Sequence, residues 1–133
     1  EDLPGGAYAM AMTDIGALAE FLSAHKDAHV ILEKAQSFPK QGIASAFNYG
    51  AFYGELRGML LVLGFRHTLV SPAIWTRVMH VGADGKDAKA RSLQVVRRLF
   101  GAVDIVPPGC KKPHDGMTDA LLLAEYGRRT LGK

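Results

Sequence analysis

Hydrophobic residues recur along the chain at two spacings, which predict helices and short strands in alternation. Between Ile15 and Leu22 the apolar positions follow three-and-four spacing, which predicts a helix that ends near Lys26. Residues 29–32 form an apolar run with two β-branched members, typical of a buried strand. This strand leads directly into Glu33. The acid is thus expected at a strand's carboxyl end, where α/β sheets bind ligands.

The same two spacings continue through the rest of the chain. The predicted elements are a loop at 34–44, a helix from Ser45 toward Gly64, a strand at 66–70, helices at 73–79 and 86–100, and a last helix that opens at Pro113 or His114. Leu93, Val96, Leu99, Phe100 and the run 121–123 are expected to face inward, with Trp75 as a core anchor. This order of elements favours a mixed α/β fold.

Three glycines interrupt the long central helix at positions 50, 54 and 58. Each glycine inside a helix costs about 1 kcal/mol relative to alanine. A compensating contact is therefore expected along this stripe. One interpretation is close packing of the helix on a sheet or on another helix. The other is a subunit interface or a groove through which DNA passes.

Composition indicates one globular domain over residues 1–133. Hydrophobic residues make up 48% of the chain and charged residues 22%. The longest apolar run, Met59 to Leu63, is far shorter than the roughly 20 residues of a membrane span. The first residues lack a basic-then-apolar signal pattern, and the lone Cys110 has no partner for an internal disulfide. We therefore expect a cytoplasmic protein without a membrane partner.

Basic residues slightly outnumber acidic ones, giving a formal charge of +3 and a pI of about 9.1. This excess permits binding to a polyanion. The distribution is more informative than the total, because the cations crowd one predicted helix and the segment before the last helix. They are Lys86, Lys89, Arg91, Arg97, Arg98, Lys111 and Lys112.

The acidic residues with the most distinctive placement are Asp115, Asp119 and Glu33. Four residues apart on a helix, Asp115 and Asp119 share one face, with Cβ atoms roughly 5 to 6 Å apart. Carboxylates that meet in one place repel one another unless a cation lies between them. Taken singly, Asp115 is also explained as a helix-opening acid stabilised by the helix dipole. Asp119 precedes three leucines, where an unpaired carboxylate is costly.

Several segments resemble the RuvC-type Holliday junction resolvases, in particular the short phage-like branch of this family within the ribonuclease H-like superfamily. The likeness covers most of the chain. It lies in the segments 32–34, 38–45 and 47–54, in Val70-Ser71-Pro72 with Trp75, in 86–89, and in the Asp-Gly-x-x-Asp-Ala-Leu-Leu-Leu-Ala-Glu-Tyr run at 115–126.

This resemblance implies a ribonuclease H-like mixed sheet flanked by helices. It also implies a symmetric homodimer that cuts branched DNA with two Mg²⁺ or Mn²⁺ ions. Glu33, Asp115 and Asp119 match the family's catalytic and metal-binding acids, with His114 as a substitute for Asp115. Hard cations of this kind prefer carboxylate oxygens. The residues expected at the phosphate backbone are Lys34, Lys40, Arg77, Lys86 and Lys89.

One departure from the family pattern concerns its first catalytic aspartate, which ends an apolar opening strand. This chain begins Glu1-Asp2-Leu3-Pro4-Gly5, with no apolar run before Asp2. We interpret this segment as following the third strand, so that the opening hairpin is missing and the fold is truncated at its N-terminus. Two hypotheses follow. The chain is either a metal-dependent endonuclease, or a truncated relative that dimerises and binds DNA without cutting it.

Overall fold

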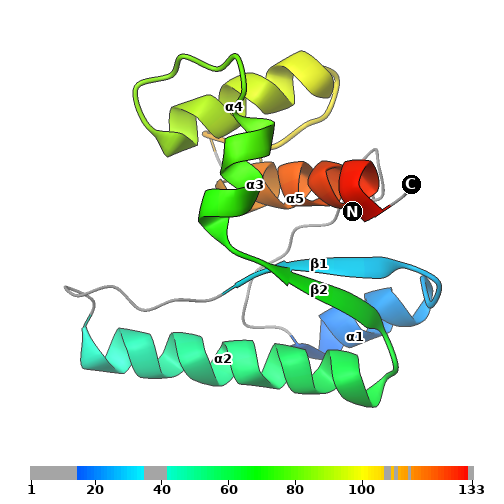
Figure 1. Ribbon diagram of the computed structural model, residues 1–133. Helices are drawn as coiled ribbons and strands as arrows, with labels where there is room; N and C mark the ends of the chain where they lie inside the picture. The colour runs from blue at the N-terminus through cyan, green and yellow to red at the C-terminus, as the bar shows by residue number, and fades with distance from the viewer. Residues whose placement is uncertain (1–14, 35–41, 107–108, 110, 114, 132–133) are drawn as a thin grey trace. The chain divides into compact units, whose positions relative to one another are not determined.

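The computed structural model describes residues 15–34, 42–106, 109, 111–113 and 115–131 (Figure 1). Its described residues form five helices and a two-stranded parallel sheet, in the order α1, β1, α2, β2, α3, α4, α5. The predicted mixed α/β class is therefore confirmed. The described residues divide into two compact units, which we call the N-terminal unit (within 11–71) and the C-terminal unit (within 72–133).

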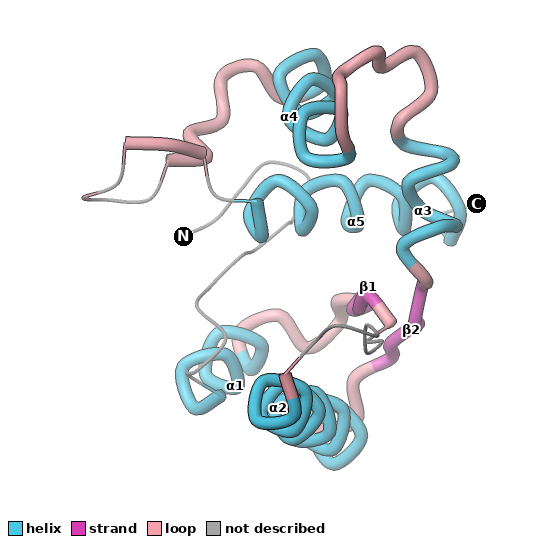
Figure 2. Tube along the Cα trace, turned by 90° about the vertical axis from the view of Figure 1, so that its left-hand side faces the viewer, coloured by secondary structure: helices cyan, strands magenta, loops and turns pink. Residues whose placement is uncertain are grey.

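The N-terminal unit pairs two short strands against two helices. It contains α1 (Ile15–Ser23), β1 (His29–Glu33), α2 (Ile43–Val62) and β2 (Arg66–Val70). The strands run parallel, with His29 opposite Arg66 and Glu33 opposite Val70. Both α1 and α2 lie on one side of the strand pair (Figures 1 and 2). Parallel strands need a crossover connection, and α2 supplies it.

A small apolar core joins the helices of this unit to its strands. Leu22, Leu60 and Phe65 are its buried members. Partly buried hydrophobic residues pack around them: Leu18, Phe21, Val30, Leu32 and Met59. Val30 and Leu32 lie two residues apart and so share one face of β1, as the period of a strand requires. The core therefore fixes β1, at whose carboxyl end Glu33 lies.

The C-terminal unit is helical, with α5 (Asp115–Leu131) packed against both α3 (Pro72–Met79) and α4 (Ala88–Leu99). Trp75 is 2% exposed, which confirms its prediction as a core anchor. Leu121, Leu122 and Leu123 are also buried, as predicted. One predicted core position is wrong: Leu99 is 37% exposed. It is the last residue of α4, and the chain leaves the helix at Phe100.

The glycine stripe of α2 is open. A Cβ atom built on Gly50, Gly54 or Gly58 would meet nothing within 4 Å. Close packing of these glycines on the chain's own sheet or helices is therefore not observed, and that interpretation is wrong for the described residues. The other interpretation, a subunit interface or a groove through which DNA passes, stays a prediction.

Most predicted boundaries hold to within two residues. The helix α2 begins at Ile43 rather than Ser45, and α4 begins at Ala88 rather than Lys86. The strand β2 has its predicted bounds. Within the described part of the chain, no helix combines the length and the apolar character that crossing a bilayer requires.

Candidate functional site

Two predicted acids lie at the start of α5. Asp115 is the first residue of the helix, and Asp119 follows one turn later on the same face. Asp115 is exposed and Asp119 is half-buried. The Lys89 Nζ atom lies 3.1 Å from the Asp115 Oδ2 atom. The predicted phosphate-binding helix and the predicted metal-binding helix are thus adjacent at this point.

The ion pair is exposed, because the Lys89 side chain is 78% and the Asp115 side chain 58% accessible. Exposed pairs of this kind contribute about 0–1 kcal/mol to stability. Lys89 can therefore leave Asp115 at little cost when a phosphate or a metal ion competes for either partner. The ion pair therefore contributes little to stability, and both charges stay accessible to other ions.

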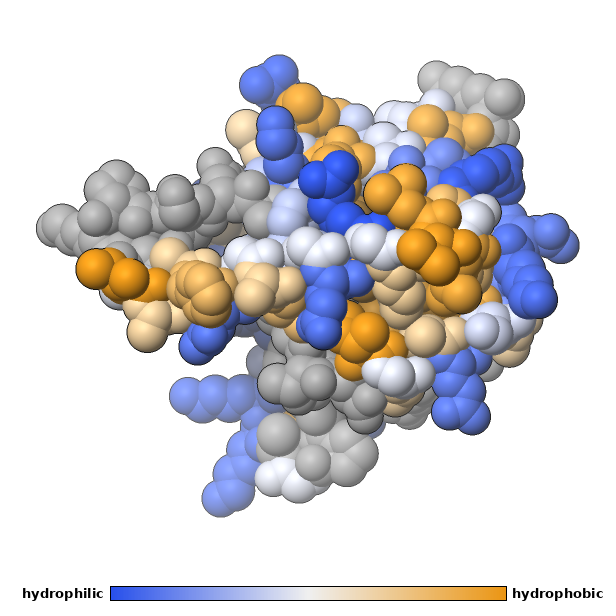
Figure 3. Space-filling view, turned by 90° about the horizontal axis from the view of Figure 1, so that it is seen from below, coloured by the Kyte–Doolittle hydropathy of each residue, from blue (hydrophilic) through white to orange (hydrophobic). Residues whose placement is uncertain are grey.

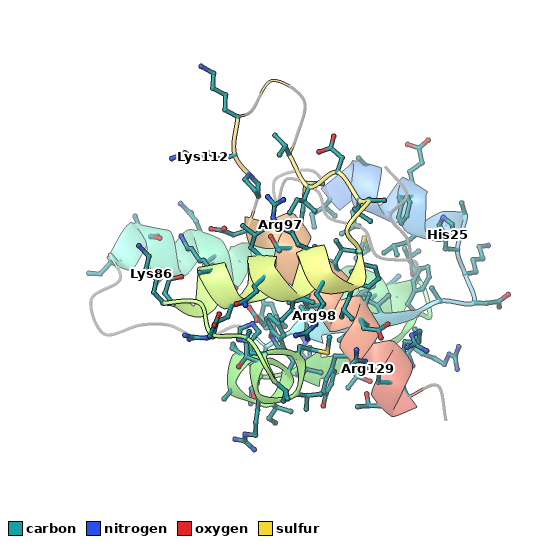
Figure 4. All side chains as sticks on the ribbon, turned by 90° about the horizontal axis from the view of Figure 1, so that it is seen from above. His25, Lys86, Arg97, Arg98, Lys112 and Arg129 are labelled. Carbon is teal, nitrogen blue, oxygen red and sulfur yellow. The ribbon has the colours of Figure 1, made fainter. Side chains whose placement is uncertain are left out.

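The basic helix α4 is held by a specific cap. The Asp87 carboxylate accepts a hydrogen bond of 2.8 Å from the Ala90 backbone N–H, which satisfies one of the free donors at the helix start. Arg97 and Arg98 fall in the last turn, where cations complement the helix dipole. Figure 4 shows both arginines on α4, with Lys86 and Lys112 on the loops around it.

The loop before α4 is fastened to the helix through Gln94. Its Oε1 atom accepts hydrogen bonds of 3.1 Å from the backbone N–H groups of Asp84 and Gly85. Its Nε2 atom donates to Asp84 Oδ1 at 2.9 Å. Arg91 adds a bond of 2.9 Å to the Gly85 carbonyl oxygen. These four bonds hold the exposed Lys86 beside the start of the basic helix.

Glycine is required within this loop at position 85. A Cβ atom on Gly85 would lie 2.8 Å from the Arg91 backbone nitrogen and 2.9 Å from Ala90, closer than real Cβ atoms come to such neighbours. The loop therefore packs directly against the first turn of α4. This close packing of Gly85 holds the backbone of the next residue, Lys86, against the start of α4.

The remaining predicted phosphate contacts are spread over both units. Arg77 is exposed in the last turn of α3. Lys34 is exposed directly after β1, and its backbone N–H donates to the Val70 carbonyl oxygen at 2.8 Å. Lys40, His114 and Asp2 lie outside the described residues. The described candidates are thus solvent-facing, as contacts to a phosphate backbone must be.

Glu33 lies half-buried in the N-terminal unit, where its charge acts on Tyr49 of α2. The sequence analysis missed both Tyr49 and Tyr53. Burial raises the pKa of Tyr49, and the negative charge of Glu33 and the neighbouring Tyr53 raise it further. Tyr53 is followed one turn later by Arg57, whose Cζ atom lies 5.7 Å from the Tyr53 ring centroid. The spacing of four residues from Tyr49 to Tyr53 and from Tyr53 to Arg57 could have revealed this shared helix face in the sequence.

A second cluster of charges, at the end of α5, is internally neutralised. Arg128 and Arg129 donate to the Glu125 carboxylate at 2.7 to 2.9 Å. These bonds, that from Arg128 first, lower the pKa of Glu125 to about 2. Glu125 therefore stays ionised and occupies both guanidinium groups. Neither arginine belongs to the predicted phosphate-binding residues.

The fit to a metal pair is partial within the described residues. There, no group of three or more His, Cys, Asp or Glu side chains lies together in a way that could hold an ion. Asp115 and Asp119 supply two carboxylates of the type that Mg²⁺ and Mn²⁺ prefer. Glu33 belongs to the N-terminal unit and the two aspartates to the C-terminal unit. The predicted set of three acids is therefore divided between the two units.

Comparison with protein-family models gives no match, and comparison with curated proteins gives none of significant similarity. A functional assignment for this chain therefore depends on the residues and contacts described above.

Proposed function

We propose that this chain is a RuvC-like, metal-dependent endonuclease with a ribonuclease H-like fold, which cuts phosphodiester bonds in branched DNA. The observation that carries the proposal is the contact between Lys89 and Asp115, 3.1 Å apart. It joins the basic helix to the acidic pair, so that phosphate-binding cations lie next to candidate metal ligands. An enzyme that cuts a polyanion with metal ions needs both groups in one place.

In this proposal the acids and the cations have separate tasks. Asp115 and Asp119 are the metal ligands that the C-terminal unit supplies, and Glu33 is the ligand that the N-terminal unit supplies. Two such ions activate water and stabilise the leaving oxygen in phosphodiester cleavage. Lys34, Lys40, Arg77, Lys86 and Lys89 neutralise backbone phosphates and position the strand. They read the shape of the DNA through its phosphates and carry no base-sequence information.

A homodimer forms part of the proposal, because a four-way junction needs paired incisions. The exposed hydrophobic residues of α2 support it: Ile43 is 91%, Phe47 73% and Val62 85% exposed. Figure 3 looks from the side on which α2 lies and shows hydrophobic residues toward both ends of the helix. The open glycine stripe lies between these ends, where a second helix could approach the backbone closely. A C2 dimer would place the same surface on both partners.

The alternative function is a DNA-binding relative that does not cut. Its supporting observation is again the pair of Lys89 and Asp115, because the ammonium group neutralises this carboxylate without a metal ion. A binding module needs its cations in place and no complete ligand set. Loss of one metal ligand cripples hydrolysis and leaves electrostatic binding nearly intact.

The Asp119→Asn variant tests the proposed active site. We expect cleavage of a labelled four-way junction in Mg²⁺ or Mn²⁺ to fall by about 100-fold or more, because the substitution removes a metal ligand and keeps the side-chain volume. Junction affinity by gel shift should stay within about twofold, since the metal ligands contribute little to counterion release.

The matched control is Asp27→Asn, the same chemical change at an exposed acid of the N-terminal unit. It should cut the junction at the wild-type rate. If Asp119→Asn cuts as fast as this control does, our site assignment is wrong.

A further inference from the structure

The helix α2 carries a polar row that none of the predicted contacts includes. We propose that Tyr49, Tyr53 and Arg57 form a binding site for one strand of DNA, with the two phenol groups and the guanidinium group directed at its phosphodiester backbone next to Glu33. The inference rests on the proposed function, because it names further contacts to the same nucleic acid. It adds to α2 a role separate from that of the glycine stripe.

The row follows from helix geometry. Side chains at intervals of four residues lie one above the other, so Tyr49, Tyr53 and Arg57 share a line along α2. The Arg57 Cζ atom is 5.7 Å from the Tyr53 ring centroid, which fixes the order of these two side chains in space. Tyr49 is 39% exposed and Arg57 is also exposed. Two members of the row are thus open to a ligand.

Tyr53 supplies the observation that points to a ligand. Its hydroxyl oxygen is shielded from solvent and has no hydrogen-bond partner within the described part of the chain. A buried hydroxyl without a partner lowers stability, and such groups are rare in folded proteins. An uncompensated polar group of this kind is expected where a protein holds a donor ready for a ligand. Phenylalanine would fill the same space without that cost.

The chemistry of the row selects the ligand. Arg57 offers N–H donors only, and a tyrosine phenol is protonated at neutral pH and can donate its O–H. Three donor side chains in line match a run of acceptor oxygens, which a phosphodiester backbone provides. The Arg57 guanidinium group lies 5.7 Å from the Tyr53 ring centroid and is exposed, so it can turn toward a phosphate that approaches the row. Exposed side chains rotate on this scale within nanoseconds.

Charge on the helix agrees with this assignment. Among the 20 residues of α2, Glu55 and Arg57 are the charged ones, and they lie two positions apart on different faces. The positive charge on the row's own face is therefore not cancelled within the helix.

The Tyr53→Phe variant distinguishes a hydroxyl that binds DNA from one that only stabilises the fold. Removing an unpaired buried hydroxyl should leave the melting temperature unchanged or raise it. The same variant should bind a four-way junction about three- to tenfold more weakly, the loss expected for one hydrogen bond. A fall in the melting temperature would mean that the hydroxyl has a partner within the folded chain, and unchanged affinity would mean that DNA does not use it. Either result overturns the inference.

The Arg57→Gln variant tests the phosphate contact through its salt dependence. The slope of log affinity against log salt should become shallower by about 0.9, the value for one phosphate contact. Lys26→Gln is the control, because it removes one exposed positive charge from the same unit at the end of α1. Its slope should match that of the wild type. Equal slopes for both variants would mean that Arg57 acts only through net charge, which contradicts a specific contact.

These outcomes separate this inference from the proposed function. If the wild-type chain binds no junction, the proposed function fails and the row has no DNA ligand. If the wild type binds and both row variants bind equally well, the row is wrong while the proposed function stands.

Discussion

The side chain of His80 connects two helices of the C-terminal unit. Its Nε2 atom lies 2.8 Å from the hydroxyl oxygen of Ser92, a buried residue of α4. Its ring meets that of Trp75 edge-on, with centroids 5.7 Å apart. Burial lowers the pKa of His80, and the nearby positive charge of Arg91 lowers it further. The neutral ring is therefore the form that the folded state favours.

This environment predicts a pH dependence of stability. The folded-state pKa of His80 lies below its ordinary value of 6.5, so the unfolded chain binds more protons in this range. Stability from this group is present above pH 6.5 and is lost as the pH falls through the folded-state pKa. Urea unfolding at pH 7, 6 and 5 should show a steeper loss for the wild type than for His80→Gln. Parallel curves would contradict this explanation.

Single residues also differ in how far the sequence predicts them. The burial of Trp75 could be predicted because a large aromatic residue beside other apolar residues has few other places to go. The helical spacing of Asp115 and Asp119 could be predicted from their positions alone. The sequence showed only that the basic residues of α4 lie close to the acidic pair along the chain. The ion pair of Lys89 with Asp115 could not be predicted, because it depends on how α4 packs on α5. The shielded hydroxyl of Tyr53, which has no partner among the described residues, could not be predicted, since a sequence pattern does not show which single atoms a fold buries.

At the level of elements, α4 and the loop before it are joined by hydrogen bonds into one unit. The sequence predicts the helix but starts it at Lys86, two residues too early. The structure begins the helix at Ala88, with Asp87 as its cap. Gln94 then ties the loop back from within the helix. These bonds join residues ten and nine positions apart, and no helix or strand period predicts them.

The hydrogen bond from Gln94 to Asp84 predicts that one substitution lowers stability and that a second substitution restores it. Gln94→Glu keeps the two backbone acceptor bonds but places a carboxylate against Asp84, so the melting temperature should fall and the loop amides should exchange faster with solvent. Asp84→Asn combined with Gln94→Glu reverses donor and acceptor and keeps the net charge. This double variant should recover most of the lost stability. Equal stability of the single and double variants would show that the Asp84 bond contributes nothing.

The central helix α2 illustrates a different limit of prediction. Glycines at 50, 54 and 58 were expected to pack closely against another segment, and among the described residues none lies within 4 Å of the position of their Cβ atoms. The pattern correctly marked an unusual helix but could not say what covers it. Packing inside the chain and packing between chains select the same small residues.

For the whole molecule, the order of helices and strands was sufficient to predict the mixed α/β class. A single domain over residues 1–133 was also predicted, and it stays a prediction beside the two compact units. The candidate site is harder, because Glu33 comes from one unit and Asp115 with Asp119 from the other. Local spacing holds no information about the distance between segments so far apart in the chain. Only the acidic pair and its neighbouring cations could be assembled from the sequence.

The measurement that tests our central claim most directly uses a labelled synthetic four-way junction, incubated with the 133-residue chain in Mg²⁺ or Mn²⁺. Gel shift in EDTA, with an unbranched duplex as competitor, reports binding in parallel. We predict preference for the junction, loss of affinity with rising salt, and paired symmetric nicks that require the divalent ion. Binding without nicks would contradict the endonuclease and favour the DNA-binding relative. Absence of both would contradict the assignment to DNA altogether.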